Sequence, residues 1–268
     1  MDKKIALVTG ASSGIGEAVA VQLASAGYKV YGTSRRGADG VQRAYEMISL
    51  DVTSDASVQQ AVATVLQKEG RIDLLVNNAG FGMSPAGAEE SSLAQAQALF
   101  DTNFFGTVRM TRAVLPHMRS KRAGRIIHIG SVLGFLPMPY GALYAASKHA
   151  IEGYSESLDH EVRNWGIHSI VVEPAYTKTA FEANSLAADS QLTAYQEVRM
   201  ALAARIKELM DAAEGPSVVA AAVFKAARAP RPRLRYTAGT LAARLRLLRT
   251  FAPAGLLDAG LRKDLKLA

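Results

Sequence analysis

The amino-acid sequence predicts an α/β fold, a doubly wound and mostly parallel sheet of seven strands with helices on both faces. Apolar runs of strand length alternate with longer segments of helical spacing along the 268 residues. The runs are almost continuously hydrophobic, as in strands that are covered on both faces. No long linker rich in Gly, Ser or Pro interrupts the alternation, so we expect residues 1–268 to form one domain.

The expected elements follow one another as the apolar spacing changes along the chain. Strands are expected at residues 5–9, 29–34, 47–50, 74–77, 125–130, 168–173 and 234–237. Helices are expected at residues 14–26, 55–69, 93–120, 142–165 and 216–227. Thr53 or Ser54 would cap the second helix, and Pro216 suits the first position of the last one.

Two segments lie outside this alternation. Residues 179–213 are rich in Ala and follow the sixth strand, where open α/β sheets place segments that cover a ligand, so we expect a lid there. Residues 238–268 form a basic C-terminal extension, since positions 228–268 hold 10 Lys and Arg but 2 Asp and Glu. This tail lacks interleaved aromatic residues and any groove-reading motif, so no nucleic-acid partner is expected.

The basic extension also carries a leucine stripe. Leu241, Leu245 and Leu248 fall on one helical face beside Arg244 and Arg249, which indicates a weak contact with an anionic membrane surface. In the alternative, the leucines pack on the protein body and the arginines are only solvated. The uncharged stretch 126–147 is long enough to span a membrane, but its glycines and prolines favour a buried strand followed by a loop.

The composition is that of an ordinary globular protein, with 49% hydrophobic and 21% charged residues. The absence of cysteine excludes disulfides, thiolate catalysis and Cys-ligated metals, and it fits a reducing compartment. The apolar run after Lys3 and Lys4 is too short for a signal peptide, so we expect a cytoplasmic protein. The five histidines lack metal-ligand spacing and are expected on the surface or in helices, and no metal is expected.

A glycine-rich turn follows the first expected strand. Gly10, Gly14 and Gly16 are spaced G-x-x-x-G-x-G, and a helix begins at the end of the turn. Glycines let backbone approach a pyrophosphate, whose charge is attracted by the helix N-terminus. Such turns are common, so this one indicates a nucleotide mainly because it lies in the first strand-helix unit.

Further polar motifs follow the later strands. Residues 77–80 (Asn-Asn-Ala-Gly) end the fourth strand, Asn103 lies in the next helix, Ser131 follows the fifth strand, and Tyr144 and Lys148 open a helix. In this order the motifs resemble those of the short-chain dehydrogenase/reductase family over residues 4–236, most nearly its steroid and retinol dehydrogenase branch. The resemblance implies a Rossmann fold and an oxidoreductase that acts on CH–OH or C=O groups with a nicotinamide dinucleotide.

The resemblance also implies a role for particular residues. It implies a catalytic tetrad of Asn103, Ser131, Tyr144 and Lys148, and an adenine contact from Asp51. The expected cofactor-binding residues are Gly10, Ser12, Ser13, Gly14, Ile15, Gly16, Arg35, Asp51, Val52, Asn78, Ala79, Gly80, Tyr144, Lys148, Pro174 and Thr179.

The chemistry of carbonyl reduction gives an independent reason for the tetrad. Hydride transfer to a ketone leaves an alkoxide that needs a proton, and an ordinary tyrosine is a weak donor near neutral pH. Lys148 lies four residues after Tyr144, hence on the same helical face, and a nearby ammonium favours a phenolate. Ser131 would hydrogen-bond the carbonyl. By family analogy, Asn103 would hold a water that connects Lys148 to solvent, and Lys148 would bind the nicotinamide ribose.

Each tetrad residue also has a simpler interpretation. Tyr144 and Lys148 could be an exposed helix pair, Ser131 a turn residue, and Asn103 a side chain that satisfies local backbone. Their joint occurrence with the glycine turn favours catalysis. A regulator that senses a dinucleotide without chemistry is the alternative from another class, although such proteins usually lose the tyrosine or the lysine.

One position departs from the family pattern, because Ala175 stands after Pro174 where the family has a glycine. Alanine adopts most glycine conformations with negative φ, so we expect activity to survive. Thr179 keeps its expected place against the nicotinamide carboxamide or the phosphates.

The end of the second strand predicts NADP(H) in preference to NAD(H). Selectivity for NAD needs an acid there to bind the ribose hydroxyls, but the nearest acid, Asp39, lies beyond Gly37. Arg35 occupies the position of the family's phosphate-binding arginine, and a guanidinium can form two charge-assisted hydrogen bonds to a phosphate. Arg36 and Ser13 would help. The alternative is that both arginines are solvated turn residues.

Apolar residues surround the expected reacting centre. They belong to the loop 132–140 and to the lid, which contributes Phe181, Leu186, Leu192, Tyr195, Met200 and Leu202. This lining predicts an apolar ketone, aldehyde or secondary alcohol, unless the lid residues pack on the body. The runner-up is a membrane-surface lipid, steroid or retinoid oxidoreductase. Family members commonly pair through the helices expected at 93–120 and 142–165, so a homodimer or homotetramer is expected.

Overall fold

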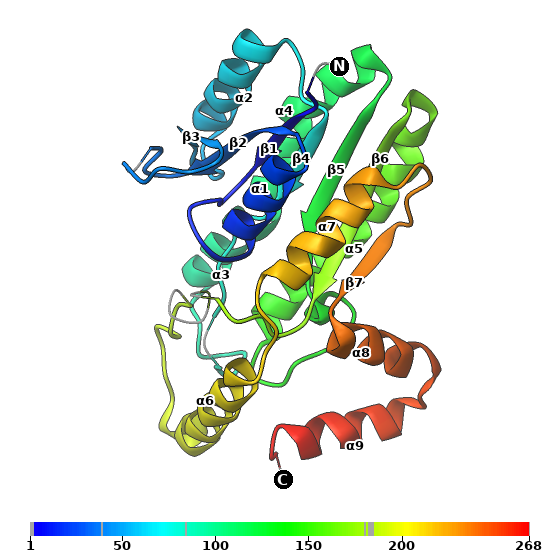
Figure 1. Ribbon diagram of the computed structural model, residues 1–268. Helices are drawn as coiled ribbons and strands as arrows, with labels where there is room; N and C mark the ends of the chain where they lie inside the picture. Colours follow the sequence, from blue (N-terminus) through cyan, green and yellow to red (C-terminus); the bar gives the residue numbers. More distant parts are fainter. Residues whose placement is uncertain (1–2, 39, 84, 180, 182–184, 268) are drawn as a thin grey trace.

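The computed structural model describes residues 3–38, 40–83, 85–179, 181 and 185–267, and it contains a seven-stranded sheet with helices on both faces (Figure 1). The strands are β1 (Ile5–Val8), β2 (Lys29–Ser34), β3 (Glu46–Ser49), β4 (Leu74–Asn77), β5 (Gly124–Ile129), β6 (Ile167–Pro174) and β7 (Arg235–Ala238). The helices are α1 (Gly14–Ser25), α2 (Asp55–Glu69), α3 (Leu93–Phe100), α4 (Gly106–Lys121), α5 (Ala142–Val162), α6 (Gln196–Asp211), α7 (Ser217–Arg228), α8 (Thr240–Phe251) and α9 (Ala254–Asp264). All strand pairs are parallel, in the order β3-β2-β1-β4-β5-β6-β7, which confirms the predicted fold class.

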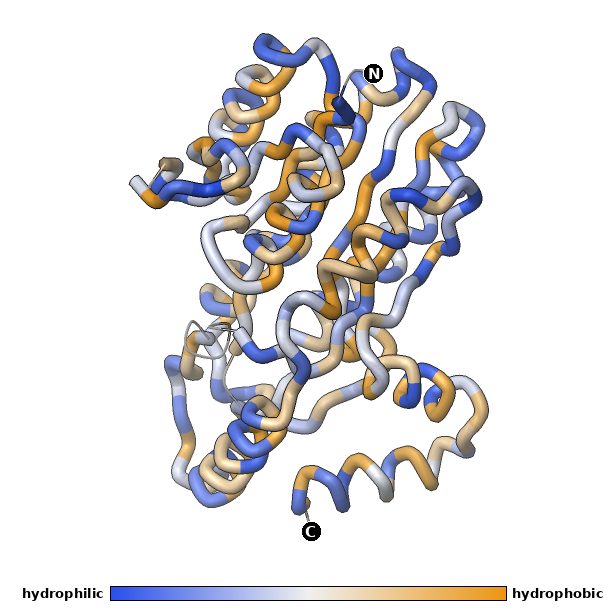
Figure 2. Tube along the Cα trace, viewed as in Figure 1, coloured by the Kyte–Doolittle hydropathy of each residue, from blue (hydrophilic) through white to orange (hydrophobic). Residues whose placement is uncertain are grey.

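The sheet separates two hydrophobic cores, because alternate side chains of each strand point to opposite faces. Ala6 and Val8 of β1 pack with α1 and α7, whereas Ile5 and Leu7 pack with α2, α4 and α5. All four side chains are at most 3% exposed. Figure 2 shows the apolar strands running between these two layers of helices. Coverage of both faces therefore explains the near-continuous hydrophobicity of the strands.

The strand order reverses between β1 and β4, which are neighbours in the sheet. In open α/β sheets such a reversal leaves a crevice at the carboxyl ends of the strands, where ligands bind. Gly10 follows β1, Asn78 follows β4 and Ser131 follows β5, so the fold brings all three to this edge.

Two expected helices are less regular than their apolar spacing predicts. The expected helix 93–120 consists of α3, a π-helical turn η1 (Asp101–Phe105) and α4. Such turns within helices are frequent at functional sites, and Asn103 lies at the centre of this one. The expected helix 142–165 consists of α5 and a short 3-10 turn, η3 (Arg163–Trp165).

The lid and the basic extension contain helices whose bounds the sequence did not define. In the lid, the 3-10 turn η5 (Thr193–Tyr195) leads into α6, and residues 180 and 182–184 lie outside the described part of the chain. The extension forms α8 and α9, and these two helices and α6 lie beyond the carboxyl ends of the strands (Figure 1). None of the helices in the described residues combines the length and the apolar character that crossing a membrane requires.

The expectation that all five histidines lie on the surface or in helices is wrong for His128. This residue lies in β5 and is 1% exposed, and its ring nitrogens pair with Asn77 Nδ2 at 3.2 Å and Ser169 Oγ at 3.1 Å. Burial lowers the pKa of His128 to about 3, so the ring is neutral. Within the described residues, no group of three or more Asp, Glu or His side chains is arranged to hold a metal ion.

Candidate active site

A cavity of about 790 Å³ opens at the carboxyl edge of the sheet. It extends from the glycine turn past the start of α5 to the leucines of α8 and α9. The predicted site residues that line it are Gly10, Ser13, Gly14, Ile15, Asn78, Ala79, Gly80, Ser131, Tyr144, Lys148, Pro174 and Thr179. The structure therefore brings most of the predicted cofactor-binding and catalytic residues to one cavity.

The glycine turn is fastened to the end of β4. The Asn78 amide donates hydrogen bonds to the carbonyls of Thr9 and Gly10, at 2.9 and 3.0 Å, and the Thr9 hydroxyl accepts one from the Asn78 N–H at 2.9 Å. Gly10 has a φ of +66°, which glycine adopts without strain. A Cβ at Gly16 would lie 2.2 Å from the Gly10 carbonyl oxygen, so a larger residue there must displace backbone.

The first turn of α1 fits the diphosphate of a dinucleotide. Its N-cap residue, Ser13, makes no side-chain cap hydrogen bond, whereas Ser54 and Ser92 cap α2 and α3. Gly14 has a φ of +60°, and a Cβ there would lie 3.4 Å from Thr179, which places Thr179 beside the turn. The backbone N–H groups at a helix N-terminus attract phosphate oxygens, and the Ser13 side chain does not compete for them here.

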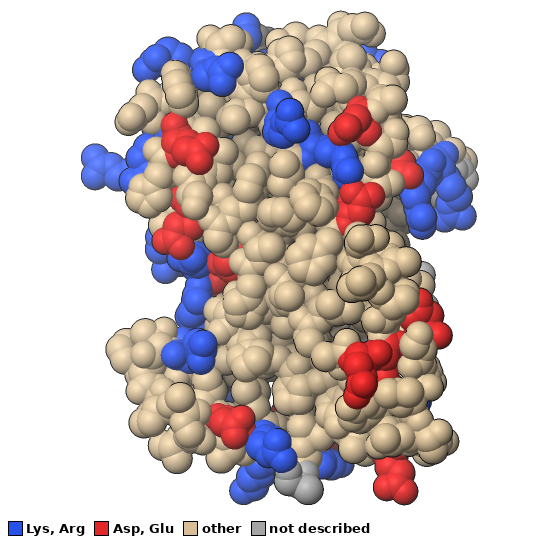
Figure 3. All heavy atoms as spheres, turned by 180° about the vertical axis from the view of Figure 1, so that it is seen from behind, with Lys and Arg blue, Asp and Glu red and all other residues tan. Residues whose placement is uncertain are grey.

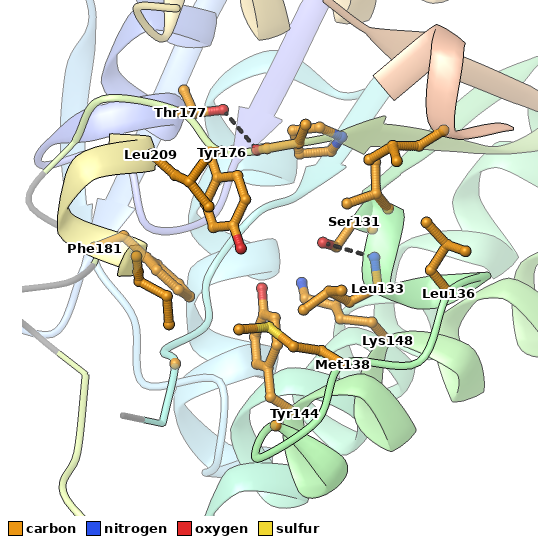
Figure 4. Close-up of a pocket in the computed structure, with 18 of the residues that line it drawn as sticks. Ser131, Leu133, Leu136, Met138, Tyr144, Lys148, Tyr176, Thr177, Phe181 and Leu209 are labelled. Carbon is orange, nitrogen blue, oxygen red and sulfur yellow. Dashed lines mark hydrogen bonds between the residues drawn. The ribbon is translucent and has the colours of Figure 1, made fainter. Parts of the chain in front are cut away.

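Tyr144 and Lys148 project from the first two turns of α5 into the cavity (Figure 4). The Lys148 Nζ lies 5.6 Å from the centre of the Tyr144 ring and donates a hydrogen bond to the Ile129 carbonyl at 2.9 Å. Burial lowers the pKa of Lys148 to about 8, against the opposing effect of the Glu152 carboxylate. The amine is therefore held beside the phenol and can exchange a proton near neutral pH.

The Ser131 hydroxyl converges with these two groups in the cavity (Figure 4). Ser131 precedes the short turn η2 (Val132–Gly134), and its Oγ accepts a hydrogen bond from the Leu133 N–H at 3.1 Å. A hydroxyl that accepts one bond keeps its own hydrogen for donation. Ser131 is thus held in position and can donate to an oxygen placed between it and Tyr144.

Asn103 does not line the cavity. Its Nδ2 donates to the Phe81 carbonyl at 2.9 Å and its Oδ1 accepts from the Phe81 N–H at 3.0 Å, while Ser147 Oγ lies 3.5 Å from Nδ2. Its side chain therefore supports the backbone after β4, as in the simpler interpretation of this residue. The water connection to Lys148 stays a prediction.

Five predicted cofactor residues also lie outside the lining of the cavity: Ser12, Gly16, Arg35, Asp51 and Val52. Arg35 is exposed directly after β2, and Val52 is buried. Hydrogen bonds from the backbone and hydroxyl of Thr53 hold the pKa of Asp51 below its usual value, so this carboxylate is charged. Asp39, the nearest acid after the second strand, lies outside the described residues.

Tyr176 is a site residue that the sequence analysis missed. It lies two residues after β6 in the lining of the cavity, and its hydroxyl points toward the Tyr144 hydroxyl (Figure 4). Its place after the carboxyl end of a central strand is the signal that could have revealed it. The neighbouring Ala175 does not adopt a positive φ, so alanine fits this position without backbone strain.

The lid contributes to the lining differently from the prediction. Of the six apolar lid residues expected there, Phe181 lies in the lining, with its ring centre 5.9 Å from that of Tyr144. Met200 is 66% exposed on another face of α6, whereas Leu202 lies on the same face as the lining residues but is fully buried against the protein body. The residues of α6 in the lining are Ile206, Leu209 and Met210. Periodicity predicts that an amphipathic helix exists, but it does not predict which segment the helix packs against.

A buried charged network lies one helical turn beyond Lys148. Arg235 of β7 donates to Glu152 of α5 at 2.8 Å, and Arg246 of α8 pairs with Glu173 of β6. Burial and the neighbouring Glu152 carboxylate raise the pKa of Glu173 to about 8, so this carboxyl keeps its proton at neutral pH. The network therefore joins α5, β6, β7 and α8 beside the cavity.

Comparison with known sequences gives close relatives. A model of the family described as short chain dehydrogenase matches residues 4–190. The chain is 44% identical over 184 residues to 3-ketodihydrosphingosine reductase from Bacteroides thetaiotaomicron, which covers 69% of this chain and 68% of that protein. It is 35% identical over 271 residues to retinol dehydrogenase 8 from Bos taurus, with 93% and 86% covered. It is 36% identical over 258 residues to 17-beta-hydroxysteroid dehydrogenase type 1 from Homo sapiens, with 88% and 77% covered.

Solved structures share the fold over nearly the whole chain. A short-chain dehydrogenase from Streptomyces avermitilis superposes with a TM-score of 0.81 at 33% identity and covers 99% of this chain and 96% of its own. A short chain dehydrogenase/reductase from Burkholderia phymatum in complex with NAD has a TM-score of 0.77 at 27% identity, with 93% and 94% covered. ElxO with NADP bound has a TM-score of 0.74 at 25% identity, with 88% and 97% covered.

The substitution Gly16→Ala should weaken dinucleotide binding about tenfold or more and lower the thermal midpoint, because the new Cβ collides with the Gly10 carbonyl. Gly153→Ala in α5 is the matched control, since a Cβ there meets no atom within 4 Å. Calorimetric titration with NADPH and NADH, together with thermal unfolding, measures both effects. Equal dinucleotide affinities for the two variants would contradict the assignment of the glycine turn.

Proposed function

Because the chain belongs to the short-chain dehydrogenase family, we propose that it transfers a hydride between NADP(H) and an apolar ketone or aldehyde, or the corresponding alcohol. The observation that carries this proposal is the single cavity that joins the glycine turn to Ser131, Tyr144 and Lys148. The first turn of α1 would hold the diphosphate, and Lys148 the nicotinamide ribose. A regulator without chemistry has no need of this convergence of proton donors.

In the proposed reduction, Ser131 Oγ donates a hydrogen bond to the substrate carbonyl oxygen and holds it beside Tyr144. A nicotinamide held by the glycine turn and Lys148 would supply the hydride for the carbonyl carbon. The Tyr144 hydroxyl then donates its proton to the oxygen as negative charge develops there. Lys148 stabilises the phenolate that remains, and its pKa of about 8 allows it to return a proton from neutral solvent. In alcohol oxidation the same groups act in the reverse order.

The lining beside Tyr144 supports an apolar substrate. Leu133, Leu136 and Met138 approach from the loop after β5, and Phe181 and Leu209 approach from the lid (Figure 4). Relatives of this chain are named for 3-ketodihydrosphingosine, retinol and 17-beta-hydroxysteroids, all of them largely hydrocarbon. Both observations point to a carbonyl group on a mainly apolar molecule.

The preference for NADP(H) rests on the end of β2. Arg35 and Arg36 are both exposed directly after Ser34, and the sequence has no acid between Ser34 and Ala38. Similar solved structures hold NAD in one case and NADP in another, so family membership alone does not decide the preference. The positive charge at this position favours a 2′-phosphate.

A second candidate is the same reaction at a membrane surface. The leucine stripe proposed from the sequence turns toward the cavity instead, because Leu241, Leu245 and Leu248 line it. Another pair on α8, Leu247 and Phe251, is 60% and 78% exposed and does not line the cavity. These two side chains lie four residues apart, near exposed arginines, and form an apolar and basic surface that suits an anionic bilayer.

Self-association through the face formed by α4 and α5 completes the proposal. The centre of the face opposite α1 and α7 carries few charges (Figure 3). At its edge, Leu93 and Phe105 are 82% and 49% exposed. Exposed apolar groups beside an uncharged surface are typical of contacts between subunits. Light scattering measures the mass in solution, and a monomer would contradict this part of the proposal.

The variant Tyr144→Phe should lose at least about 10²-fold of the turnover of any apolar ketone that the parent reduces, because the ring still packs but its proton is gone. Its dinucleotide affinity should remain near that of the parent. Tyr28→Phe is the control for a lost hydroxyl, because Tyr28 lies three residues after α1 and does not line the cavity. The measurement is the decrease in NADPH absorbance over a panel of aldehydes and ketones. Near-parental turnover by the Tyr144 variant would show that the tetrad is misassigned.

The parent should use NADPH with a higher kcat/KM than NADH, and Arg35→Ala should reduce the NADPH value about tenfold with little change for NADH. The loss corresponds to one charge-assisted hydrogen bond to the 2′-phosphate. Arg231→Ala removes an exposed arginine elsewhere and is the control. A parent that favours NADH, or equal losses for both cofactors in the Arg35 variant, would refute the preference.

If the second candidate is correct, the protein should sediment with vesicles that contain phosphatidylserine, and less so at high salt, because screening weakens the attraction. Phe251→Glu should reduce the bound fraction severalfold. Val21→Glu, which places the same charge at an exposed valine of α1, should leave it unchanged. Absence of sedimentation at low salt, or equal binding by all three proteins, would exclude the membrane surface.

A further inference from the structure

The end of the cavity farthest from the glycine turn is built by three helices outside the sheet, α6, α8 and α9. We name it the tail chamber, and its walls are Leu209 of α6, Leu245 and Leu248 of α8, Leu257 and Leu261 of α9, and Leu265 directly after α9. We infer that the tail chamber binds the aliphatic tail of a long-chain aldehyde or ketone whose carbonyl lies at Tyr144. The identity of the reacting end rests on the proposed function, whereas the chamber itself rests on the observations that follow.

The two C-terminal helices present continuous apolar faces to the cavity. The lining positions of α8 and the residue after it, 241, 245, 248 and 252, follow helical spacing and rise over roughly 16 Å. The lining positions of α9 fall in the pairs 256–257, 260–261 and 264–265, again one helical face. Figure 2 shows apolar residues recurring along both helices at the lower end of the molecule. The chamber is therefore elongated, as a hydrocarbon chain is.

The chamber lacks a polar partner for the far end of a ligand. Among the residues that these two helices contribute to the described lining, Asp264 is the charged one. Its carboxylate accepts a hydrogen bond from Arg205 of α6 at 2.9 Å, and its backbone carbonyl accepts a second at 2.9 Å. A second oxygen on the substrate would lose its water there without a replacement, which costs binding energy. A plain hydrocarbon end carries no such penalty.

Ion pairs fix the outer wall of the chamber. Arg205 joins α6 to Asp264 of α9, and Lys266 lies 3.5 Å from Glu208 of α6. These pairs are partly exposed and add little to stability. They do, however, hold α9 beside the lid helix, so that Leu261 and Leu265 face the same space as Leu209. The lid and the C-terminal helix thereby form one wall.

Two glycines of α9 provide a matched test. Gly260 lies in the lining of the cavity and Gly255 does not. A Cβ at either position meets no atom within 4 Å, so both accept a larger side chain without a clash. Gly260→Phe should therefore fill part of the tail chamber, whereas Gly255→Phe adds the same ring to the same helix outside it.

The experiment combines binding with turnover. The affinity of the parent for hexanol, octanol, decanol and dodecanol, measured by calorimetry, should rise about fourfold for each methylene that the chamber buries. The kcat/KM for the matching aldehydes should rise in parallel. In Gly260→Phe both series should level off at a shorter chain, while the values for hexanol and hexanal stay near those of the parent. Gly255→Phe should follow the parent throughout.

The outcomes separate the chamber from the reaction. If the affinity rises with chain length and Gly260→Phe ends this rise at a shorter chain, but no aldehyde is turned over, the chamber is supported and the reduction of long-chain aldehydes is refuted. Turnover with affinities independent of chain length would support the reaction and refute the chamber. Identical series for Gly260→Phe and the parent would also refute it. Thermal midpoints for both variants verify that each protein is folded.

Discussion

The fastening of the glycine turn to β4 is the constraint on which the rest of the site depends. The Asn78 amide occupies the carbonyls of Thr9 and Gly10, and the space that remains beside Gly10 admits only a hydrogen at Gly16. Helix α1 must therefore begin close to the crevice between β1 and β4, with its first N–H groups not capped by the side chain of Ser13. A dinucleotide that binds its diphosphate there can extend only along the carboxyl edge, toward Tyr144 and Lys148.

The sequence was sufficient for the features whose cause is local or shared by a family. Buried strands read as apolar runs, and the seven that were expected form the observed sheet. The spacing of Tyr144 and Lys148 placed them on one face of a helix, and the structure directs both into the cavity. What remained hidden depends on contacts between distant segments. Periodicity suggested a leucine stripe on the basic tail, but only packing could show that it faces the cavity.

Polar residues illustrate the same limit. Asn103 was expected from its motif. Its side chain bonds the backbone of Phe81, however, which lies 22 residues earlier and could not be inferred from spacing. His128 stands in an apolar strand and is neutral because it is buried, and its ring partners Asn77 and Ser169 come from two other strands. Tyr176 lay within a motif already singled out, but its direction toward Tyr144 follows from the backbone after β6. The positions of these residues could be predicted from the sequence, but the directions of their side chains could not.

The pairing of Arg246 with Glu173 makes the C-terminal segment an integral part of the domain. Glu173 is fully buried at the end of β6, and the arginine that faces it comes from α8. A buried carboxyl that loses a hydrogen-bond partner is typically destabilised by about 1–3 kcal/mol, because its loss of water is no longer compensated. A chimera that exchanges this tail for that of a relative must therefore carry a hydrogen-bond donor at the same position. The cavity-facing leucines of the tail carry no such requirement and can differ with the substrate.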